Sequence, residues 1–251
     1  MSLDIARTPD PCDGPRRFAR YAAPPNARGF CGPDAVEFSE VAAAGPAREL
    51  RHLATAFEGA YPYLELLAAS SASHDPLGDD VVEAYWLGSG LLDRVDAGAL
   101  GHSLDARFRR RAGRRWTRLE SAVAQGCANH AFHVLVVSPW VGLMRDGIVD
   151  QPLEIVDQCR ISWGRVVGSR EGAQVGTIVV ERRPVEWRAG RLELGPVAPS
   201  TAFTDIPVSD GDVVSLHWGA VCDVISRRQL GWLQWVTGEQ LATIAAIGVP
   251  D

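Results

Sequence analysis

The chain has 251 residues, of which 46% are hydrophobic and 22% are charged, and this composition is typical of a globular protein. All 25 basic residues are arginine. The sequence therefore excludes enzymes that need a Schiff-base lysine, such as pyridoxal-phosphate enzymes and lysine aldolases, as well as Walker-type phosphate loops and kinase-like sites. The formal net charge of −6 argues against general nucleic-acid binding, because phosphate contacts require local positive charge.

Positive charge is concentrated in one segment of the chain. Arginines lie between Arg107 and Arg118, at positions 107, 109, 110, 111, 114, 115 and 118. This Arg107–Arg118 patch is either a solvated helix face that pairs with acidic neighbours, or a docking surface for an anionic ligand or an acidic protein partner. We expect neither a nucleic-acid partner nor a membrane partner.

Two features of the sequence concern its location in the cell. Residues 1–11 contain no apolar core, so we expect no signal peptide. The longest apolar stretch, Ala131–Met144, is interrupted by His133, Ser138 and Pro139 and is too short to span a bilayer. These features predict a cytoplasmic protein.

The cysteines are odd in number and widely spaced. No two of the five lie closer than 19 residues, which is typical neither of a disulfide framework nor of a paired-cysteine zinc knuckle. We expect reduced thiols, most of them small buried apolar residues. They are Cys12, Cys31, Cys127, Cys159 and Cys222.

The first half of the chain predicts helices. Residues 1–30 are rich in proline, glycine and arginine and predict an irregular arm, whereas residues 33–127 predict a helical lobe. An Asp80-x-x-Glu83 start signal predicts a helix near 80–92, and Asp96 is a suitable cap for another. The expected inward-facing residues are Leu50, Leu53, Ala54, Phe57, Val82, Tyr85, Trp86, Leu100, Leu104 and Phe108.

The second half predicts a mostly antiparallel sheet lobe over residues 130–220, followed by closing helices in 226–247. The closing helices are expected at two capping boxes, Ser226-x-x-Gln229 and Thr237-x-x-Gln240. Helices followed by strands predict the α+β class in a single domain over 1–251. The expected strands are Ala131–Val137, Ile161–Val167, Val175–Arg182, Val185–Trp187, Arg191–Leu194 and Val213–Trp218, with turns around Gly168–Gly172 and at Gly190.

The segment GFCGPD is a candidate for chemistry. Pro33 suits the first position of a helix, so Cys31 is expected at a helix N-terminus, where unpaired amides and the helix dipole lower a thiol pKa. A cysteine nucleophile needs a base, and His133 on the first expected strand is the candidate. Asp150 could orient its imidazole. The alternative is that Cys31 is a buried structural cysteine.

This order of cysteine, helices, strand histidine and carboxylate resembles the papain-like superfamily, especially its double-glycine leader peptidases and phytochelatin synthases. The resemblance covers two short segments. It implies thiolate attack on an amide or ester, with Cys31 as nucleophile, His133 as base and Asp150 as orienter. Those families place a glutamine about six residues before the cysteine for the oxyanion hole. Here Pro25 occupies that position, and Asn26 is the nearest amide.

The histidines invite a metal hypothesis. Strand parity argues against it, because His130 and His133 are expected on opposite faces of one strand, as are His217 and Cys222. A site in which His133 and His217 bind a metal together with Cys31 stays open. The alternative is that the histidines satisfy buried backbone groups. We expect no stoichiometric metal and no cofactor, and we treat His130 and His217 as candidate ligand-binding residues.

Aromatic residues could form a pocket for a small organic ligand. Trp140, Trp163 and Trp218 lie in or just after expected strands beside polar residues. Together with Tyr85 they could line such a pocket, with Arg160 as an anion anchor. The alternatives are core packing of the large rings and a strand-end cap for Arg160.

Several longer segments carry a second resemblance. They are FARYAAPPN, GFCGPD, FEGAYPYLELLA, VVEAYWLGSGLLDRV, HAFHVLVVSPWVGL, CRISWGRVV and VSLHWGAVCD. They resemble an uncharacterised, mostly actinobacterial family of about 250 residues, over residues 16–245 of this chain. Some members of that family are encoded near NiFe-hydrogenase and maturation genes, which implies an accessory role.

Three functional hypotheses follow. The first is a cytosolic enzyme that uses Cys31 and His133 for acyl or amide chemistry on a small-molecule substrate, as a cysteine-dependent hydrolase or acyltransferase. The second is a non-catalytic accessory protein that binds a metal or a partner, as in hydrogenase maturation. The third is an enzyme that binds its ligand among the tryptophans without covalent chemistry. The placement of Cys31 relative to His133 distinguishes the first from the others.

Overall fold

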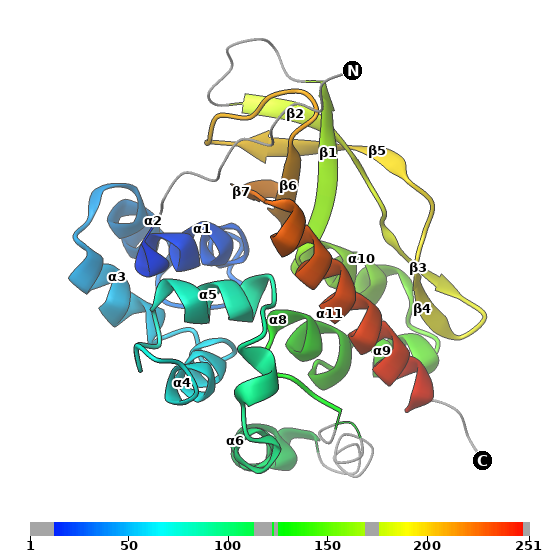
Figure 1. The fold of residues 1–251 in the computed structure, drawn as a ribbon. Helices are drawn as coiled ribbons and strands as arrows, with labels where there is room; N and C mark the ends of the chain where they lie inside the picture. The colour runs from blue at the N-terminus through cyan, green and yellow to red at the C-terminus, as the bar shows by residue number, and fades with distance from the viewer. Residues whose placement is uncertain (1–12, 113–121, 123–124, 169–175, 248–251) are drawn as a thin grey trace.

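The protein combines helices with a closed β-barrel. The computed structural model describes residues 13–112, 122, 125–168 and 176–247. Figure 1 shows α1–α5 on one side, the barrel strands on the other, and α11 running diagonally across the molecule. This arrangement is the α+β class that the sequence predicted.

The helical part begins earlier and extends further than predicted. Its elements are α1 (Gly14–Asn26), α2 (Ala35–Ala44), α3 (Ala47–Ala54), α4 (Tyr61–Ala69), α5 (Asp79–Trp86), the 3-10 helix η1 (Leu92–Arg94), α6 (Ala97–Ala112), α8 (His130–Phe132), the π-helix η3 (His133–Val137), α9 (Trp140–Arg145), α10 (Asp150–Cys159) and α11 (Arg227–Ala246). Within the described ranges, no helix has both the length and the hydrophobicity needed to cross a membrane.

The prediction of an irregular arm over residues 1–30 was wrong for the described part of it, because α1 forms there. Asp13 caps the helix by accepting a hydrogen bond from the Arg16 amide at 2.9 Å, and a proline occupies its first turn, where no amide hydrogen is needed. Phe18, Tyr21 and Ala22 then form a buried stripe at helical spacing.

The predicted strand Ala131–Val137 was also wrong, because this segment forms α8 and η3. Its β-branched residues favour a strand locally. However, Val134, Leu135 and Val136 are consecutive and all nearly inaccessible, at 1%, 0% and 2% exposure. In a half-exposed strand, buried and exposed side chains would alternate. Burial of all three side chains has therefore overridden the local preference for a strand.

Five described strands close into a barrel in the order β1-β2-β5-β7-β6, and a separate two-stranded sheet pairs β3 with β4. Neighbours in the barrel are antiparallel except β5 and β7, which are parallel. The strands are β1 (Ser162–Gly168), β2 (Gly176–Arg182), β3 (Val185–Arg188), β4 (Arg191–Leu194), β5 (Ala198–Thr204), β6 (Val213–His217) and β7 (Ala220–Val224).

The sequence predicted β1 to β4 and β6, but it missed β5 and β7. Pro199 lies inside β5, and proline argues against a strand. β7 follows β6 after the two residues Trp218 and Gly219, whose φ angles of 52° and 73° suit a tight hairpin turn with a left-handed backbone at both positions. A tryptophan is unusual in such a turn, so the sequence carries no hairpin signal there. The predicted turn at Gly168–Gly172 lies mostly outside the described residues.

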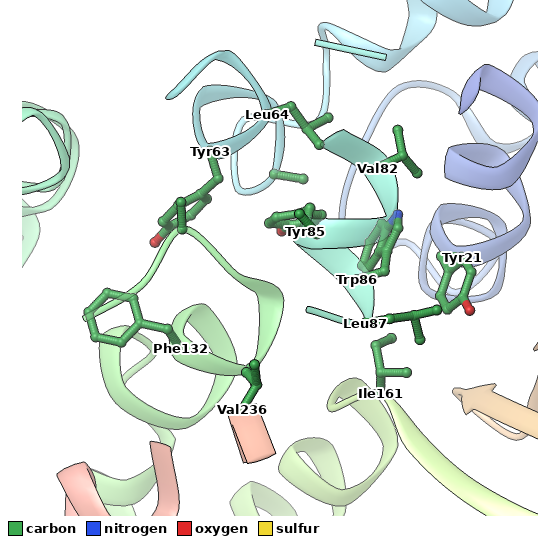
Figure 2. Packing of buried hydrophobic residues seen from close by; sticks show 14 of the residues in the cluster. Tyr21, Tyr63, Leu64, Val82, Tyr85, Trp86, Leu87, Phe132, Ile161 and Val236 are labelled. Carbon is green, nitrogen blue, oxygen red and sulfur yellow. The ribbon is translucent and has the colours of Figure 1, made fainter. Parts of the chain in front are cut away.

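The largest hydrophobic cluster forms around α5, as predicted for its inward-facing residues. Val82, Tyr85 and Trp86 are all buried (Figure 2). The Trp86 ring stacks on Tyr21 from α1 with 5.3 Å between ring centroids, which joins the two helices through their largest side chains. A second cluster fills the barrel, with Val180 and Val214 fully buried.

One helix, not two, closes the chain. The capping box at Ser226 and Gln229 begins α11 as predicted. Thr237 instead lies inside the helix, where its hydroxyl donates to the carbonyl of Leu233, and Gln240 donates to the Cys127 sulfur. Thr237 and Gln240 resemble a helix start in the sequence, but they make contacts within the protein interior from the middle of α11.

Asp157 in α10 ties three elements together. It accepts two hydrogen bonds from Arg182 of β2, at 3.1 and 2.6 Å, and one from the Val185 amide of β3 at 2.8 Å. It also pairs with Arg160, whose side chain is 2% exposed. Burial alone would raise the pKa of Asp157, but these hydrogen bonds and the arginine charges outweigh burial and lower it.

We predict that Asp157→Asn lowers the free energy of unfolding by about 3–5 kcal/mol, because it leaves the buried Arg160 guanidinium without a charged partner. Urea denaturation measures this change. The matched control is Asp105→Asn, which removes the exposed partner of Arg109 and should cost at most about 0.5 kcal/mol.

The effect should depend on pH in a defined direction. Since the folded-state pKa of Asp157 is lowered, its stabilisation is present above the unfolded pKa of about 4 and is lost as the pH falls through the folded value. The difference between wild type and Asp157→Asn should therefore shrink below about pH 4. A loss under about 1 kcal/mol at pH 7 would contradict a central role for this carboxylate.

Candidate functional site

Three ligand-type side chains converge at the boundary between the helices and the barrel. His130, Cys159 and His217 place one nitrogen or sulfur atom each within 4.8 Å of one another. They come from the first residue of α8, the last residue of α10 and the last residue of β6. Both histidines are buried, and Cys159 is half-buried. We call these three residues the His–Cys–His cluster.

Hydrogen bonds to backbone groups hold these elements together. Asn129 caps α8 by accepting from the Ala131 amide, and its side-chain amide donates to the Ala84 carbonyl of α5, both at 2.8 Å. The amide of Trp218 donates to the Gln158 carbonyl at 2.8 Å, which fixes the β6–β7 turn onto the end of α10. These contacts bring His130 and His217 to the end of α10.

One ring nitrogen of His217 makes a hydrogen bond, and the other has no hydrogen-bond partner of acceptable geometry. Its Nδ1 lies 2.6 Å from the Tyr21 carbonyl, which can only accept, so Nδ1 carries the hydrogen. The Nε2 atom is buried and makes no hydrogen bond of acceptable geometry, although the Cys159 backbone lies close enough to the ring to oppose the lowering of its pKa. Burial lowers the pKa of His217 well below its usual value, which favours a neutral ring with a lone pair on Nε2. An unsatisfied buried acceptor costs about 1–3 kcal/mol.

His130 has partners on both sides of its ring. Its Nε2 donates to the Cys159 carbonyl at 2.8 Å, and its Nδ1 accepts from the Tyr85 hydroxyl at 3.2 Å. Burial lowers the pKa of His130 to about 4, and it raises the pKa of the Cys159 thiol to about 12. The metal-free cluster is therefore electrically neutral around pH 7.

Strand parity does not separate His130 from His133, because this segment is helical. His217 and Cys222 lie on the consecutive strands β6 and β7, not on one strand as predicted. On a helix, residues three apart lie on the same side. His130 contacts Tyr85, and His133 contacts Tyr63, at 3.2 and 3.3 Å between ring nitrogen and hydroxyl oxygen. The tyrosine rings stack on each other. The cluster thus uses His130, and the predicted combination of His133 with His217 is not the one brought together.

Cys31 does not lie at the start of a helix. α2 begins at Ala35, not at Pro33, and Asp34 is its N-cap. The Asp34 carboxylate accepts the free amides of Val36 and Glu37, each at 3.0 Å, so they do not stabilise a thiolate. Cys31 reaches solvent, but neighbouring protein atoms desolvate the thiol and raise its pKa to about 11. The predicted low pKa is therefore wrong.

The other members of the predicted triad have separate surroundings. Among the residues that the structure describes, no hydrogen bond joins Cys31 to His133 or His133 to Asp150. Asp150 is an exposed residue at the start of α10. Burial lowers the pKa of His133 to about 3. Asn26 donates to the backbone carbonyls of Cys31 and Pro33, both at 2.8 Å, so its amide already has a structural role.

Of the predicted aromatic pocket, the structure brings together Arg160 and Trp163, with the guanidinium carbon 5.9 Å from the centroid of the indole ring. Trp140 and Trp163 are half-buried and pack against the main hydrophobic cluster, in line with the core-packing alternative. Arg160 pairs with Asp157 and donates to the Arg183 carbonyl, so it acts as a structural tie. Trp218 adjoins the His–Cys–His cluster, unlike the other two tryptophans, because it follows His217 directly in the chain. Tyr85, another residue of the predicted pocket, also lies at the cluster, where its hydroxyl contacts Nδ1 of His130.

The Arg107–Arg118 patch is only partly described. Arg107 lies over the Tyr63 ring, 4.5 Å from its centroid, and Arg109 pairs with Asp105 within α6. Arg110 is exposed. The side chains at 111, 114, 115 and 118 lie outside the described residues, so an acidic partner at this patch stays a prediction.

Sequence reasoning named His130 and His217 but missed Cys159 as their partner. The available signal was that CRISWGRVV and VSLHWGAVCD, two of the segments singled out above, contain Cys159 and His217. Neither segment indicates that a helix end and a strand end meet, since that depends on the tertiary contact between Trp218 and Gln158.

Comparisons with known proteins place the chain in a family without giving it an activity. No curated protein and no solved structure matched it. One family model matches residues 10–249, which confirms the resemblance to an uncharacterised family. The actinobacterial distribution and the link to hydrogenase genes stay predictions. The chain belongs to this family, which is described as a family of unknown function (DUF6390).

Proposed function

We propose that this protein binds a divalent transition-metal ion, preferentially Zn²⁺, at the His–Cys–His cluster. The observation that carries the proposal is the Nε2 atom of His217, which is buried without a hydrogen-bond partner while Nδ1 donates to a backbone carbonyl. Metal-ligating histidines have this arrangement, because a hydrogen bond at one nitrogen fixes the lone pair of the other toward the ion.

The donor set supports an ion of this class. Two imidazole nitrogens and one thiolate suit Zn²⁺ and neighbouring transition ions, and they do not suit Mg²⁺ or Ca²⁺, which prefer oxygen. Tetrahedral bonds of about 2.0–2.3 Å separate ligand atoms by about 3.4–3.8 Å. The cluster spans up to 4.8 Å, so loading requires a contraction of about 1 Å.

Loading also requires protons to move at two ligands. Cys159 binds as a thiolate and releases its proton. His130 now uses its Nε2 hydrogen to bond the Cys159 carbonyl, so metal binding through Nε2 needs the other tautomer, with the hydrogen on Nδ1. The Tyr85 hydroxyl then accepts this hydrogen, whereas it donates in the metal-free state. Tyr85 is thus suited to serve as an outer-shell partner of either tautomer.

The cysteine-enzyme hypothesis has less support. It requires a nucleophilic Cys31 and a base at His133, but the pKa of Cys31 is raised and His133 faces Tyr63. Acyl or amide chemistry at these residues stays an untested prediction. The metal-binding alternative explains an otherwise unsatisfied buried atom, which the enzyme hypothesis leaves unexplained.

We predict that protein purified without chelators, or reconstituted with Zn²⁺, contains about one equivalent of metal by elemental analysis. His217→Ala should weaken the affinity by more than the ~100-fold that loss of an outer-shell partner can cost, because it removes a direct ligand. His102→Ala, which removes an exposed histidine on α6, should leave metal content unchanged.

Two results would contradict this proposal. One is metal-free wild-type protein that takes up no Zn²⁺, Co²⁺ or Ni²⁺ in a competition titration. The other is retention of metal by His217→Ala at wild-type affinity. Thermal melting of the metal-free variants should accompany both measurements, so that loss of binding is separated from loss of fold.

We also predict that Tyr85→Phe weakens Zn²⁺ binding by about 10-fold, because it removes the hydroxyl that holds Nδ1 of His130. Tyr61→Phe is the matched control, since Tyr61 is a partly exposed tyrosine on α4 and should not change the affinity. Equal affinities of the two variants, measured with a chromophoric chelator, would count against the assigned role of Tyr85.

A further inference from the structure

A groove lies along the N-terminal half of α11, the helix that crosses the near side of the molecule in Figure 1. Its volume of about 420 Å³ falls within the range of about 300–1,000 Å³ that is typical of small-molecule sites. Aromatic rings with a few charged groups are also typical of such sites. The residues that line the groove are Asp93, Arg227, Arg228, Gly231, Trp232 and Trp235.

The groove has one wall from α11 and one from the segment that follows α5. Gly88 in this segment has a φ of 92°, and a Cβ there would lie 2.8 Å from a methyl carbon of Val236 on α11. Glycine therefore allows the segment to pack directly against the helix. The chain then continues into η1, which brings Asp93 to the groove.

The middle of the groove is open because Gly231 has no side chain. Gly231 lies inside α11 and does not have a positive φ, and a Cβ built on it would meet no atom within 4 Å. Neither backbone conformation nor crowding therefore requires glycine here, although glycine is less favourable than alanine inside a helix. What this glycine provides is space between the arginines one turn before it and Trp235 one turn after it.

Two tryptophan rings form the aromatic part of the groove. Trp235 is 46% exposed, whereas tryptophan is highly buried on average. The rings of Trp232 and Trp235 meet at 87° with 5.5 Å between their centroids, and this edge-to-face contact restrains both of them. A flat ligand that stacks on Trp235 therefore meets a surface that is already ordered, which reduces the entropy lost on binding.

The charges of the groove favour an occupant with a single negative charge. Arg228 lies 2.6 Å from the Glu83 carboxylate, so its charge is balanced within the protein. Arg227 is exposed and forms no hydrogen bond or ion pair within the described part of the chain. Asp93 would repel a second negative charge, and the net charge of −6 disfavours a polyanion.

We infer that this groove binds a flat aromatic monocarboxylate, with its ring on Trp235 and its carboxylate on Arg227. Arginine presents parallel N–H donors that match the two oxygens of a carboxylate. Asp93 can only accept hydrogen bonds at neutral pH, so it favours ligands that also carry an N–H or O–H donor. The inference does not depend on the metal proposal, because the groove shares no residue with the His–Cys–His cluster.

Isothermal titration calorimetry with 2-naphthoate tests the inference, because this probe combines a flat ring system with one carboxylate. For a compound of this size in an open groove we expect a dissociation constant of about 0.1–1 mM. Two control compounds each lack one feature. Neutral 2-naphthol has no carboxylate and cyclohexanecarboxylate has no flat ring, so each should bind at least about 10-fold more weakly.

Gly231→Leu is the decisive variant. Leucine fills the open space, so the affinity for 2-naphthoate should fall by at least about 10-fold. The melting temperature should stay equal or rise, because leucine favours a helix more than glycine does. The matched control is Gly238→Leu, which replaces another α11 glycine with open space around it. Gly238 does not line this groove, so the affinity should be unchanged.

Two further variants test the individual contacts. Trp235→Ala removes the stacking surface and should weaken binding by about 10-fold. Arg227→Gln removes the charge-assisted hydrogen bonds and should weaken binding by a similar factor of about 10. Arg48→Gln is the control for charge, since Arg48 is a highly exposed arginine on α3, and it should leave the affinity unchanged.

Three results would overturn the inference. The first is a wild-type protein that binds no 2-naphthoate at millimolar concentrations, and the second is wild-type affinity in Gly231→Leu. The third is a wild-type dimer that Trp235→Ala converts into a monomer in analytical ultracentrifugation, which would assign this face to a second copy of the chain. Weaker binding in the three groove variants, with unchanged affinity in both control variants, would support the inference.

Discussion

Two neutral imidazole rings, buried where the helices meet the barrel, constrain much of the structure around them. Each ring uses one N–H to bind a backbone carbonyl of a different element: His217 of β6 binds Tyr21 in α1, and His130 of α8 binds Cys159 in α10. Charging either ring there would carry a large desolvation penalty. The same two hydrogen bonds therefore join four elements, and the one at Nδ1 of His217 leaves the lone pair of its Nε2 free.

The fold could be predicted where local patterns and tertiary environment agree. The buried face of α5 and the capping box of α11 follow rules that act within one or two helical turns. The errors lie where the environment dominates. Val134–Val136 have strand-forming composition but are enclosed by helices, and Thr237 resembles a helix start but lies inside α11. Such segments have no local property that distinguishes the two outcomes.

The candidate site was predictable in its residue types more than in its arrangement. The histidines stand out in the sequence, but the β-branched residues around them predict a strand, which would put His130 and His133 on opposite faces, whereas the helix brings them to one side. Cys31 was expected at a helix N-terminus, but α2 begins at Ala35, and Asp34 occupies the amides that were expected to activate the thiol. Cys159 and His217 come together through the turn between β6 and β7, in which Trp218 has a left-handed backbone conformation. No local rule predicts a tryptophan in this conformation.

The hydrogen bond between Tyr21 and His217 joins residues separated by 196 positions. During synthesis, α1 emerges from the ribosome long before β6, and domains generally assemble as their parts become available. The Tyr21 carbonyl that orients His217 is therefore without this partner until most of the chain has been made. Contacts of such high sequence separation form slowly, since the loop-closure entropy has to be overcome first. The proposed three-residue metal site is accordingly complete only after β6 has been made, because a shorter nascent chain has Cys159 and His130 but lacks the histidine at position 217.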